Sequence, residues 1–221
     1  MAFSQGRTWL AAANFHEGDL VVNYPWDGYP SLSQFVSGPS VAPDDVTLTY
    51  LAKAYASLNP AMLQGPFRDD GGVTNGAAWY PVYGSYQDWD YTTAGCIHFT
   101  IETSLVKAPP PSAIPSLWEQ NRDALLALPL RAYEGVRGRV TDAASGAPLA
   151  ATLYVRSAAG AAAPVPFYAS RGHGFYARPL APGRNYSLVA TMAGYADAVA
   201  QITVPVGGGG VVRDFALVAK P

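Results

Sequence analysis

The stretch Trp9-Leu-Ala-Ala-Ala-Asn-Phe-His16-Glu-Gly-Asp-Leu-Val-Val-Asn-Tyr-Pro-Trp-Asp27 contains the pattern that organises the N-terminal part of this chain. Its apolar run from Trp9 to Phe15 is rich in small and aromatic residues and is bounded by the turn at Gly18, which predicts a buried strand. His16 would then lie at the carboxyl end of this strand, where open α/β sheets bind ligands. A core histidine with satisfied hydrogen bonds is the alternative explanation.

Two later stretches also combine aromatic, polar and apolar residues in a regular way. They are Thr74-Asn-Gly-Ala-Ala-Trp-Tyr80-Pro-Val-Tyr-Gly-Ser-Tyr-Gln87-Asp-Trp-Asp-Tyr91 and Cys96-Ile-His-Phe-Thr-Ile-Glu102-Thr-Ser104. The second alternates between apolar and polar residues, which predicts a strand with Glu102 on its polar face. On this pattern alone, an exposed strand carboxylate explains Glu102.

Taken in order, these blocks resemble the zinc metallocarboxypeptidases, in particular their regulatory, basic-specific (D/E/N-like) branch. That branch carries similar motifs: Ala-Asn-Phe-His-Gly-Gly, Asn-Tyr-Pro-x-Asp, Thr-Asn-Gly-Ala-x-Trp-Tyr, Gln-Asp-Trp-Asn-Tyr and Thr-x-Glu-x-Ser. All of these blocks have a counterpart here, and an ordered set is more specific than any single motif. The resemblance covers roughly residues 7 to 130 and implies the C-terminal half of a mixed-sheet α/β catalytic domain.

The resemblance assigns catalytic roles to three residues. His16 matches the single histidine that serves as the third zinc ligand, and neutral imidazole is a normal ligand for Zn²⁺. Glu102 matches the carboxylate that takes a proton from zinc-bound water and passes it to the leaving amine. Tyr80 matches the mobile tyrosine that hydrogen-bonds the substrate, because it precedes Glu102 by 22 residues, as in the family, whereas Tyr91 precedes it by only 11.

Two further residues match positions that line the pocket for the last side chain of the substrate. Asp27 follows His16 by 11 residues, as in the branch that trims Lys or Arg, and Gln87 lies in the later block. A carboxylate at the base of a pocket favours a cationic side chain through a charge-assisted hydrogen bond. Asp27 could instead be a turn residue after Pro25, since aspartate is common in turns.

The chain also departs from the family pattern. Glu17 replaces the usual Gly after the histidine ligand, His98 replaces a Glu, and Asp90 replaces an Asn. No His-x-x-Glu motif occurs anywhere, so the sequence supplies one of the three protein ligands that a catalytic zinc normally has. We therefore expect a truncated chain in which Met1 is not the natural start, and one that neither hydrolyses peptides nor holds zinc tightly by itself.

Elsewhere in this part of the chain, the sequence predicts two helices. One should run from about residue 45 to 58, where Asn59-Pro60 ends it, and the other from Ser116 to about Leu128, where Pro129 ends it. Residues 64–76, which are rich in Gly and Asp, are expected to form a surface loop, and the aromatic residues 80–91 a packed loop.

Beyond Arg131 the sequence consists of short strand candidates separated by Gly and Pro turns, which indicates an all-β sandwich. The candidates are residues 135–142, 151–155, 174–180, 186–190, 200–204 and 214–218. Its Gly-x-Val-x-Asp, Gly-x-Tyr-x-Arg and Gly-Tyr motifs resemble the transthyretin-like domain that follows the catalytic domain in the same branch. We therefore predict a partial catalytic domain over residues 1–133 and a transthyretin-like sandwich over residues 134–221.

The composition excludes several classes of protein. The 221 residues carry a net charge of −2 without a cluster of Lys or Arg, so there is no nucleic-acid footprint. No run of about 18 apolar residues is present to span a membrane, and no signal peptide is recognisable. Cys96 is the single cysteine, which excludes an internal disulfide. The family resemblance implies a secreted or extracytoplasmic protein.

Three functions remain open from the sequence. The first is a zinc-dependent exopeptidase that removes C-terminal Lys or Arg from peptides or proteins. The second is a catalytically inactive homologue that binds peptide C-termini without cleaving them, although the retention of His16, Tyr80 and Glu102 argues against it. The third is an interaction or folding role for the sandwich.

Overall fold

The computed structural model describes residues 3, 7–31, 37–156 and 163–221, and the chain divides into two compact units. The mixed-sheet unit consists of Ala11–Trp89 and Ile97–Arg131. The β unit consists of Met1–Leu10, Asp90–Cys96 and Ala132–Pro221.

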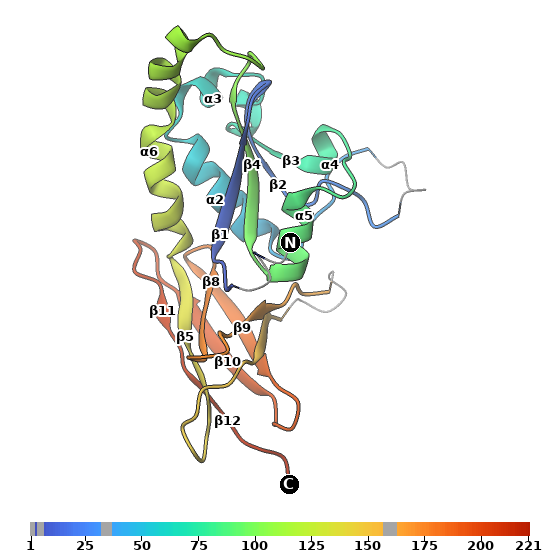
Figure 1. Ribbon diagram of the computed structural model, residues 1–221, viewed down its shortest axis with the longest axis vertical. Helices are drawn as coiled ribbons and strands as arrows, with labels where there is room; N and C mark the ends of the chain where they lie inside the picture. Colours follow the sequence, from blue (N-terminus) through green and yellow to red (C-terminus); the bar gives the residue numbers. More distant parts are fainter. Residues whose placement is uncertain (1–2, 4–6, 32–36, 157–162) are drawn as a thin grey trace. The chain divides into compact units, whose positions relative to one another are not determined.

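A four-stranded sheet forms the centre of the mixed-sheet unit (Figure 1). Its strands, in spatial order, are β1 (Ala11–His16), β4 (Ile97–Ser104), β2 (Asp19–Tyr24) and β3 (Val73–Asn75). β4 runs parallel to β1 and antiparallel to β2, and β2 runs parallel to β3. The sheet is therefore mixed, and β4 has a hydrogen-bonded neighbour on each side.

The expected strand before His16 forms, but it is not buried. β1 is the outermost strand of this sheet among the described residues, and half of the Phe15 side chain is exposed. The apolar run predicted a core strand because a strand of apolar residues is stabilised when it is buried. Burial also requires neighbours on both sides, and within the described residues β1 pairs only with β4.

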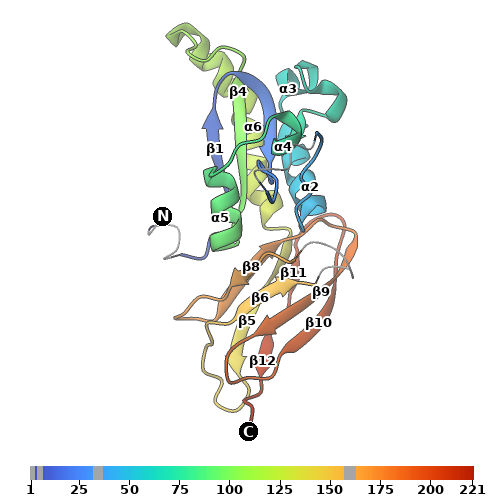
Figure 2. The same ribbon diagram turned by 90° about the vertical axis from the view of Figure 1, so that its right-hand side faces the viewer.

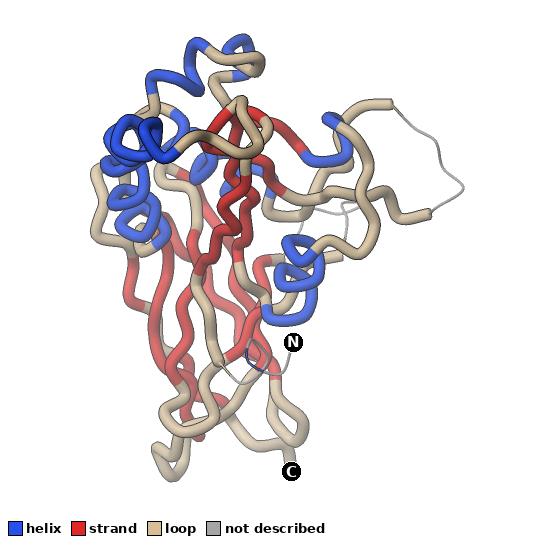
Figure 3. Tube along the Cα trace, turned by 45° about the horizontal axis from the view of Figure 1, so that its top comes forward, coloured by secondary structure: helices blue, strands red, loops and turns tan. Residues whose placement is uncertain are grey.

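Helices lie around the strands of this unit (Figure 3). The α-helices are α2 (Asp45–Ala56), α3 (Pro60–Gln64), α4 (Gly76–Trp79), α5 (Tyr86–Ala94) and α6 (Ile114–Ala132), and there are two 3-10 turns, η1 (Arg68–Asp70) and η2 (Pro111–Ala113). The last residues of α5 and of α6, from Asp90 and from Ala132 onward, belong to the β unit. α2 packs on β2 and β3 through a fully buried face that includes Leu48, Leu51 and Tyr55.

The two long helices were predicted correctly, but the end of α6 and the two expected loops were not. α6 continues through Pro129 to Ala132, because the proline removes one backbone hydrogen bond near the end of a 19-residue helix and leaves the rest intact. Residues 64–76 contain η1 and β3, and residues 80–91 contain the start of α5. β3 is only three residues long and pairs with β2, so its strand character depends on a distant partner.

The β unit contains two layers of strands (Figure 2). One sheet has the order β10 (Ala198–Val204), β9 (Arg184–Thr191), β6 (Thr152–Val155), β7 (Phe167–Tyr168). The other has the order β11 (Val211–Val212), β5 (Gly135–Asp142), β12 (Phe215–Leu217), and β8 (Phe175–Pro179) also pairs with β5. Apolar side chains from both sheets form a single buried cluster, which includes Val140, Leu153, Tyr176, Leu188 and Leu217.

All six strand candidates of the C-terminal part correspond to observed strands, whereas β7 and β11 were not anticipated because each is only two residues long. The expected α/β class, a mixed-sheet domain followed by an all-β sandwich, is confirmed. Within the described ranges, none of the helices has the length and apolar character needed to cross a membrane.

α2 and α6 are joined by a buried polar network centred on Asn121. Its Oδ1 accepts hydrogen bonds from the Tyr55 hydroxyl (2.8 Å) and from Asn59 Nδ2 (2.9 Å), and its Nδ2 donates to the Leu117 carbonyl (2.8 Å). Tyr55 and Asn59 are fully buried, so neither can turn to water for a replacement partner.

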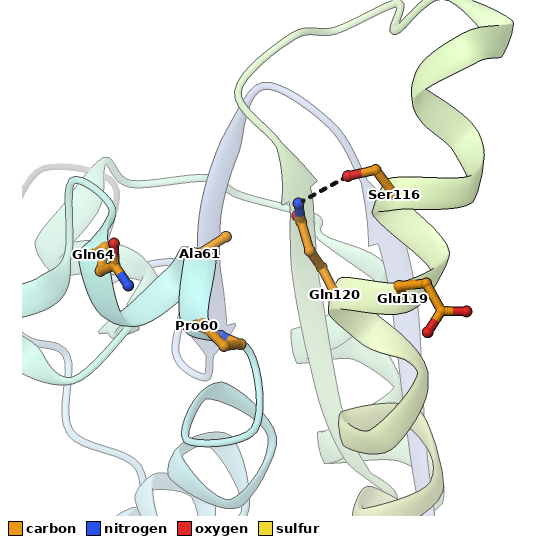
Figure 4. Close-up of a pocket in the computed structure, with 6 residues that line it drawn as sticks. All are labelled: Pro60, Ala61, Gln64, Ser116, Glu119 and Gln120. Carbon is orange, nitrogen blue, oxygen red and sulfur yellow. Dashed lines mark hydrogen bonds between the residues drawn. The ribbon is translucent and has the colours of Figure 1, made fainter.

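Asn121→Ala should therefore lower the free energy of unfolding by about 2 kcal/mol or more, because it leaves two buried donors unsatisfied. Gln120→Ala is the matched control on the same helix, since Gln120 bonds Ser116 at the surface in the shallow hollow between α3 and α6 (Figure 4). The control should change stability by no more than about 0.5 kcal/mol. Urea denaturation measures both, and equal effects would show that the network does not stabilise the packing.

Candidate active site

The pairing of β1 with β4 brings together His16, from the first of the sequence motifs, and Glu102, from the last. The parallel register of β1 and β4 places the two residues directly opposite one another, and His16 Nδ1 lies 3.1 Å from Glu102 Oε2. The two side chains differ in exposure: 59% for His16 and 7% for Glu102. The structure thus presents an open imidazole beside a buried carboxylate.

This geometry removes the simple alternatives for both residues. His16 is not a core histidine, because most of its ring is accessible, and Glu102 is not an exposed strand carboxylate. Glu102 lies between β1 and β2, paired with His16 on one side and with Val21 on the other. A carboxylate held in this way can fix the orientation of the imidazole and accept a proton from a neighbouring group.

Asp27 lies in a second, buried cluster. Its Oδ1 accepts hydrogen bonds from Asn23 Nδ2 (3.1 Å) and Gln87 Nε2 (3.0 Å), and its exposure is only 5%. Burial raises the pKa of Asp27, and hydrogen bonds from Ser85 and Asn23 act in the opposite direction. These partners are neutral, and no lysine or arginine of the described chain pairs with Asp27. Such a buried position differs from that of an ordinary turn aspartate.

The segment before Asp27 is held by Asn75 at the end of β3. Asn75 Nδ2 donates to the carbonyls of Pro25 (3.1 Å) and Ser40 (3.0 Å), and its Oδ1 accepts from the Ser40 backbone N–H (2.9 Å). The Trp26 carbonyl accepts from the Ala77 N–H at 2.9 Å. The Thr-Asn-Gly-Ala block therefore fixes the irregular chain that contains Asp27.

Gly76 is required by the close approach of Asp27. A Cβ atom at this position would lie 1.9 Å from Asp27 Oδ1 and 2.9 Å from Asn23 Oδ1. Contacts under about 3 Å are far inside van der Waals distance, so only glycine fits without displacement of the carboxylate. Gly76 is thus required because it packs against Asp27, a requirement that the sequence alone did not reveal.

Asp88, on the first turn of α5, holds the backbone of Asp27 and Gly28. Both carboxylate oxygens lie 3.0 Å from the Asp27 N–H nitrogen, and Oδ2 lies 3.3 Å from that of Gly28. Burial raises the pKa of Asp88 to about 7 and the negative charge of Asp27 adds to this, while the two backbone hydrogen bonds act against it. Asp88 therefore contacts the main chain of Asp27, while Asn23 and Gln87 contact its carboxylate.

Tyr80 follows α4 directly, and 53% of it is exposed. Partial burial raises its pKa, and the charges of Glu102 and Asp27 raise it further. The phenol therefore keeps its proton over a wide pH range and remains a hydrogen-bond donor.

The profile of the family described as zinc carboxypeptidase matches residues 1–124. The chain is 35% identical to Carboxypeptidase SOL1 of Arabidopsis thaliana over 96% of its own length and 34% identical to Carboxypeptidase E of Caenorhabditis elegans over the same share. It is 38% identical to Carboxypeptidase D of Mus musculus over 92% of its length.

The chain belongs to the zinc carboxypeptidase family. The family resemblance deduced from the ordered motifs is thereby confirmed, and family membership implies Zn²⁺ as the cofactor. The chain spans 43% of the length of the Arabidopsis relative, 46% of the nematode relative and 15% of the mouse relative.

The described residues do not by themselves form a catalytic zinc site of this family. The imidazole of His16 is an accessible nitrogen donor, as a zinc ligand must be, but catalytic zinc sites normally have three protein ligands. Among the described residues, His16 belongs to no group of three His, Cys, Asp or Glu side chains that could hold one ion. His16 therefore fits as one ligand of an incomplete set.

Four of the five sequence-predicted site residues fall into two hydrogen-bonded pairs, and Tyr80 belongs to neither. His16 contacts Glu102, and Gln87 contacts Asp27. The sequence did not single out Asn23, Gly76 or Asp88. Asn23 and Gly76 lie within the recognised motifs Asn-Tyr-Pro-x-Asp and Thr-Asn-Gly-Ala, so a signal was present. Asp88 directly follows Gln87, but nothing in its spacing indicated that it bonds residues 60 or more positions earlier.

Of the three departures from the family pattern, Glu17 and His98 lie in the mixed-sheet unit and Asp90 is buried in α5. Glu17 is exposed after β1. His98 is buried on β4, and its ring meets the Tyr86 ring edge-on at a centroid distance of 5.3 Å. Its electrostatic influence lowers the pKa of Asp27, in opposition to burial.

Gly76→Ala should lower the free energy of unfolding by about 1–3 kcal/mol, because the added methyl group overpacks the site against Asp27 and Asn23. Gly172→Ala is the matched control, since a Cβ there meets nothing within 4 Å and the backbone is not in the left-handed region. Both variants can be compared by urea denaturation. A Gly76→Ala protein as stable as the control would mean that the close approach to Asp27 is relaxed in solution.

Proposed function

We propose that this chain is part of a zinc-dependent exopeptidase that removes C-terminal Lys or Arg from peptides or proteins. The observation that supports this specificity is the environment of Asp27. The two amides that bond this buried carboxylate are neutral and no Lys or Arg of the described residues pairs with it, so a cationic side chain of the substrate would add a charge-assisted hydrogen bond. In this proposal Asp27 and Gln87 line the pocket for the last side chain of the substrate.

The proposed chemistry depends on the first cluster. Glu102 would accept a proton from the attacking water and return it to the leaving amine, and the Tyr80 hydroxyl would donate a hydrogen bond to the substrate. His16 would be one zinc ligand, with the remaining ligands supplied by residues beyond these 221. When bound, zinc would polarise the scissile carbonyl as a Lewis acid.

The proposal extends to the organisation and location of the protein. We assign residues 1–133 to a partial catalytic domain and residues 134–221 to a transthyretin-like sandwich. The family match to residues 1–124 and the two-layered sheets of the β unit support this division, although residues 1–10 and 90–96 cluster with the β unit. An extracytoplasmic location follows from the resemblance to the regulatory branch, and peptide or protein C-termini are the proposed partners.

A second candidate is a homologue that binds peptide C-termini without cleaving them, although the retention of His16, Tyr80 and Glu102 argues against it. The two candidates share the Asp27 pocket and differ in chemistry. Turnover of a peptide ending in Arg by the full-length protein distinguishes them, because the binding protein would show affinity without cleavage.

Glu102→Gln in the full-length enzyme should lower kcat by about 10²–10⁴-fold, because an amide cannot accept the proton. The zinc content should not change, since Glu102 handles protons in this proposal and does not ligate the metal. Kinetics and metal analysis on the same preparation test both statements. Loss of zinc together with activity would overturn the role proposed for Glu102.

Asp27→Asn should reduce the preference for peptides ending in Arg over matched peptides ending in Phe, by about 1–3 kcal/mol in kcat/KM. In the unaltered enzyme the preference for Arg should weaken as the pH falls, because only the ionised carboxylate of Asp27 binds a cation. Burial raises the pKa of Asp27, so this weakening should begin at a higher pH than it would for an exposed aspartate. Asp69→Asn, at an exposed carboxylate, is the control. Equal efficiency toward both peptides in the unaltered enzyme would remove Asp27 from the specificity pocket.

A further inference from the structure

The first turn of α5 contacts Asp27 through two successive residues. Gln87 donates to the carboxylate of Asp27, whereas Asp88 accepts from its backbone N–H. The same short helical segment therefore holds the side chain of Asp27 at one end and its main chain at the other. Gly28 is included in the second contact.

The backbone around Asp27 is irregular, so its position depends on individual hydrogen bonds. Residues 25–28 lie between β2 and α2, outside any helix or strand. The Asp27 carbonyl accepts a hydrogen bond from the Val82 N–H at 2.8 Å. The backbone N–H groups of Asp27 and Gly28 both donate to the Asp88 carboxylate. An acceptor in this position prevents two partly buried N–H groups from being left unpaired.

The position of the Asp27 carboxylate is also tightly restricted in space. The absence of a side chain at Gly76 is what makes room for Oδ1, because even one added methyl group would overlap with it. A shift of the Asp27 backbone would therefore move the carboxylate away from its amide partners or into the Gly76 main chain. The orientation of the proposed pocket acid depends on the main-chain contacts made by Asp88.

We propose that Asp88 is a positioning residue for substrate selection, which fixes the Asp27 carboxylate to receive a cationic C-terminal side chain. This inference rests on the proposed function. Asp88 acts through the Asp27 backbone, and both of its carboxylate oxygens are used as acceptors. An asparagine in its place would retain one acceptor oxygen, whereas an alanine would retain none.

The inference can be tested by steady-state kinetics of the full-length enzyme on matched peptides ending in Arg and in Phe. Asp88→Ala should raise KM for the Arg peptide about tenfold or more and leave its kcat within about twofold. The reason is that the Arg side chain of the substrate would lose the same binding free energy in the ground state and in the transition state. The constants for the Phe peptide and the zinc content should not change. Asp88→Asn should be intermediate, since it keeps one acceptor.

Two variants measured alongside make the result decisive. Asp69→Ala removes an exposed aspartate from the 3-10 turn η1 and should match the unaltered enzyme. Asp27→Asn tests the proposed function itself. If Asp27→Asn abolishes the preference for Arg while Asp88→Ala preserves it, the role of Asp88 is refuted and the proposed function stands. If Asp27→Asn leaves the preference intact, the proposed function fails first.

Other results also contradict the inference. Equal losses for the Arg and Phe peptides in Asp88→Ala, with reduced kcat, would show a general structural role. Identical KM values in Asp88→Asn and Asp88→Ala would show that the charge of Asp88 is what matters and not its hydrogen-bond acceptors. Should Asp88→Ala fail to fold, the Asp88→Asn variant decides: an unchanged preference for Arg would overturn the proposal and a partial loss would support it.

Discussion

The carboxylate of Asp27 is buried among amide groups, and the arrangement of the surrounding chain follows from that burial. A buried negative charge without a counter-ion is costly unless its oxygens accept good hydrogen bonds. Asn23 and Gln87 supply such bonds, and Gly76 provides the space in which the carboxylate sits. Because these residues come from β2, α5 and the start of α4, the burial of one carboxylate requires three separate segments to be placed correctly.

The central strand β4 has the corresponding role for the second cluster. It is hydrogen-bonded to β1 and β2, and these two ladders determine what faces Glu102. The parallel ladder aligns Glu102 with His16, so a carboxylate and an imidazole separated by 86 positions come within 3.1 Å. A slip of one residue in this register would turn one of the two side chains to the other face of the sheet.

The β unit shows a more conventional source of stability. Its core is a single cluster of apolar side chains from two sheets, with Arg178 as a buried exception. The guanidinium donates to the Gly95 carbonyl and lies 5.2 Å from the centroid of the Phe167 ring. An arginine can be accommodated in such a position when its charge faces a carbonyl and aromatic rings. These contacts connect residues 90–96 with the strands of this unit.

The sequence by itself determined the family, the α/β class, both long helices, most strands and the residues His16, Tyr80, Asp27, Gln87 and Glu102 as candidates. These features depend on local periodicity or on ordered motifs, which are visible along the chain. The sequence could not determine that β1 would be half-exposed, that residues 73–75 would form a strand, or that Asp88 would bond the backbone of Asp27. Each of these depends on a partner that is distant in sequence, and only the tertiary structure specifies which partner is present.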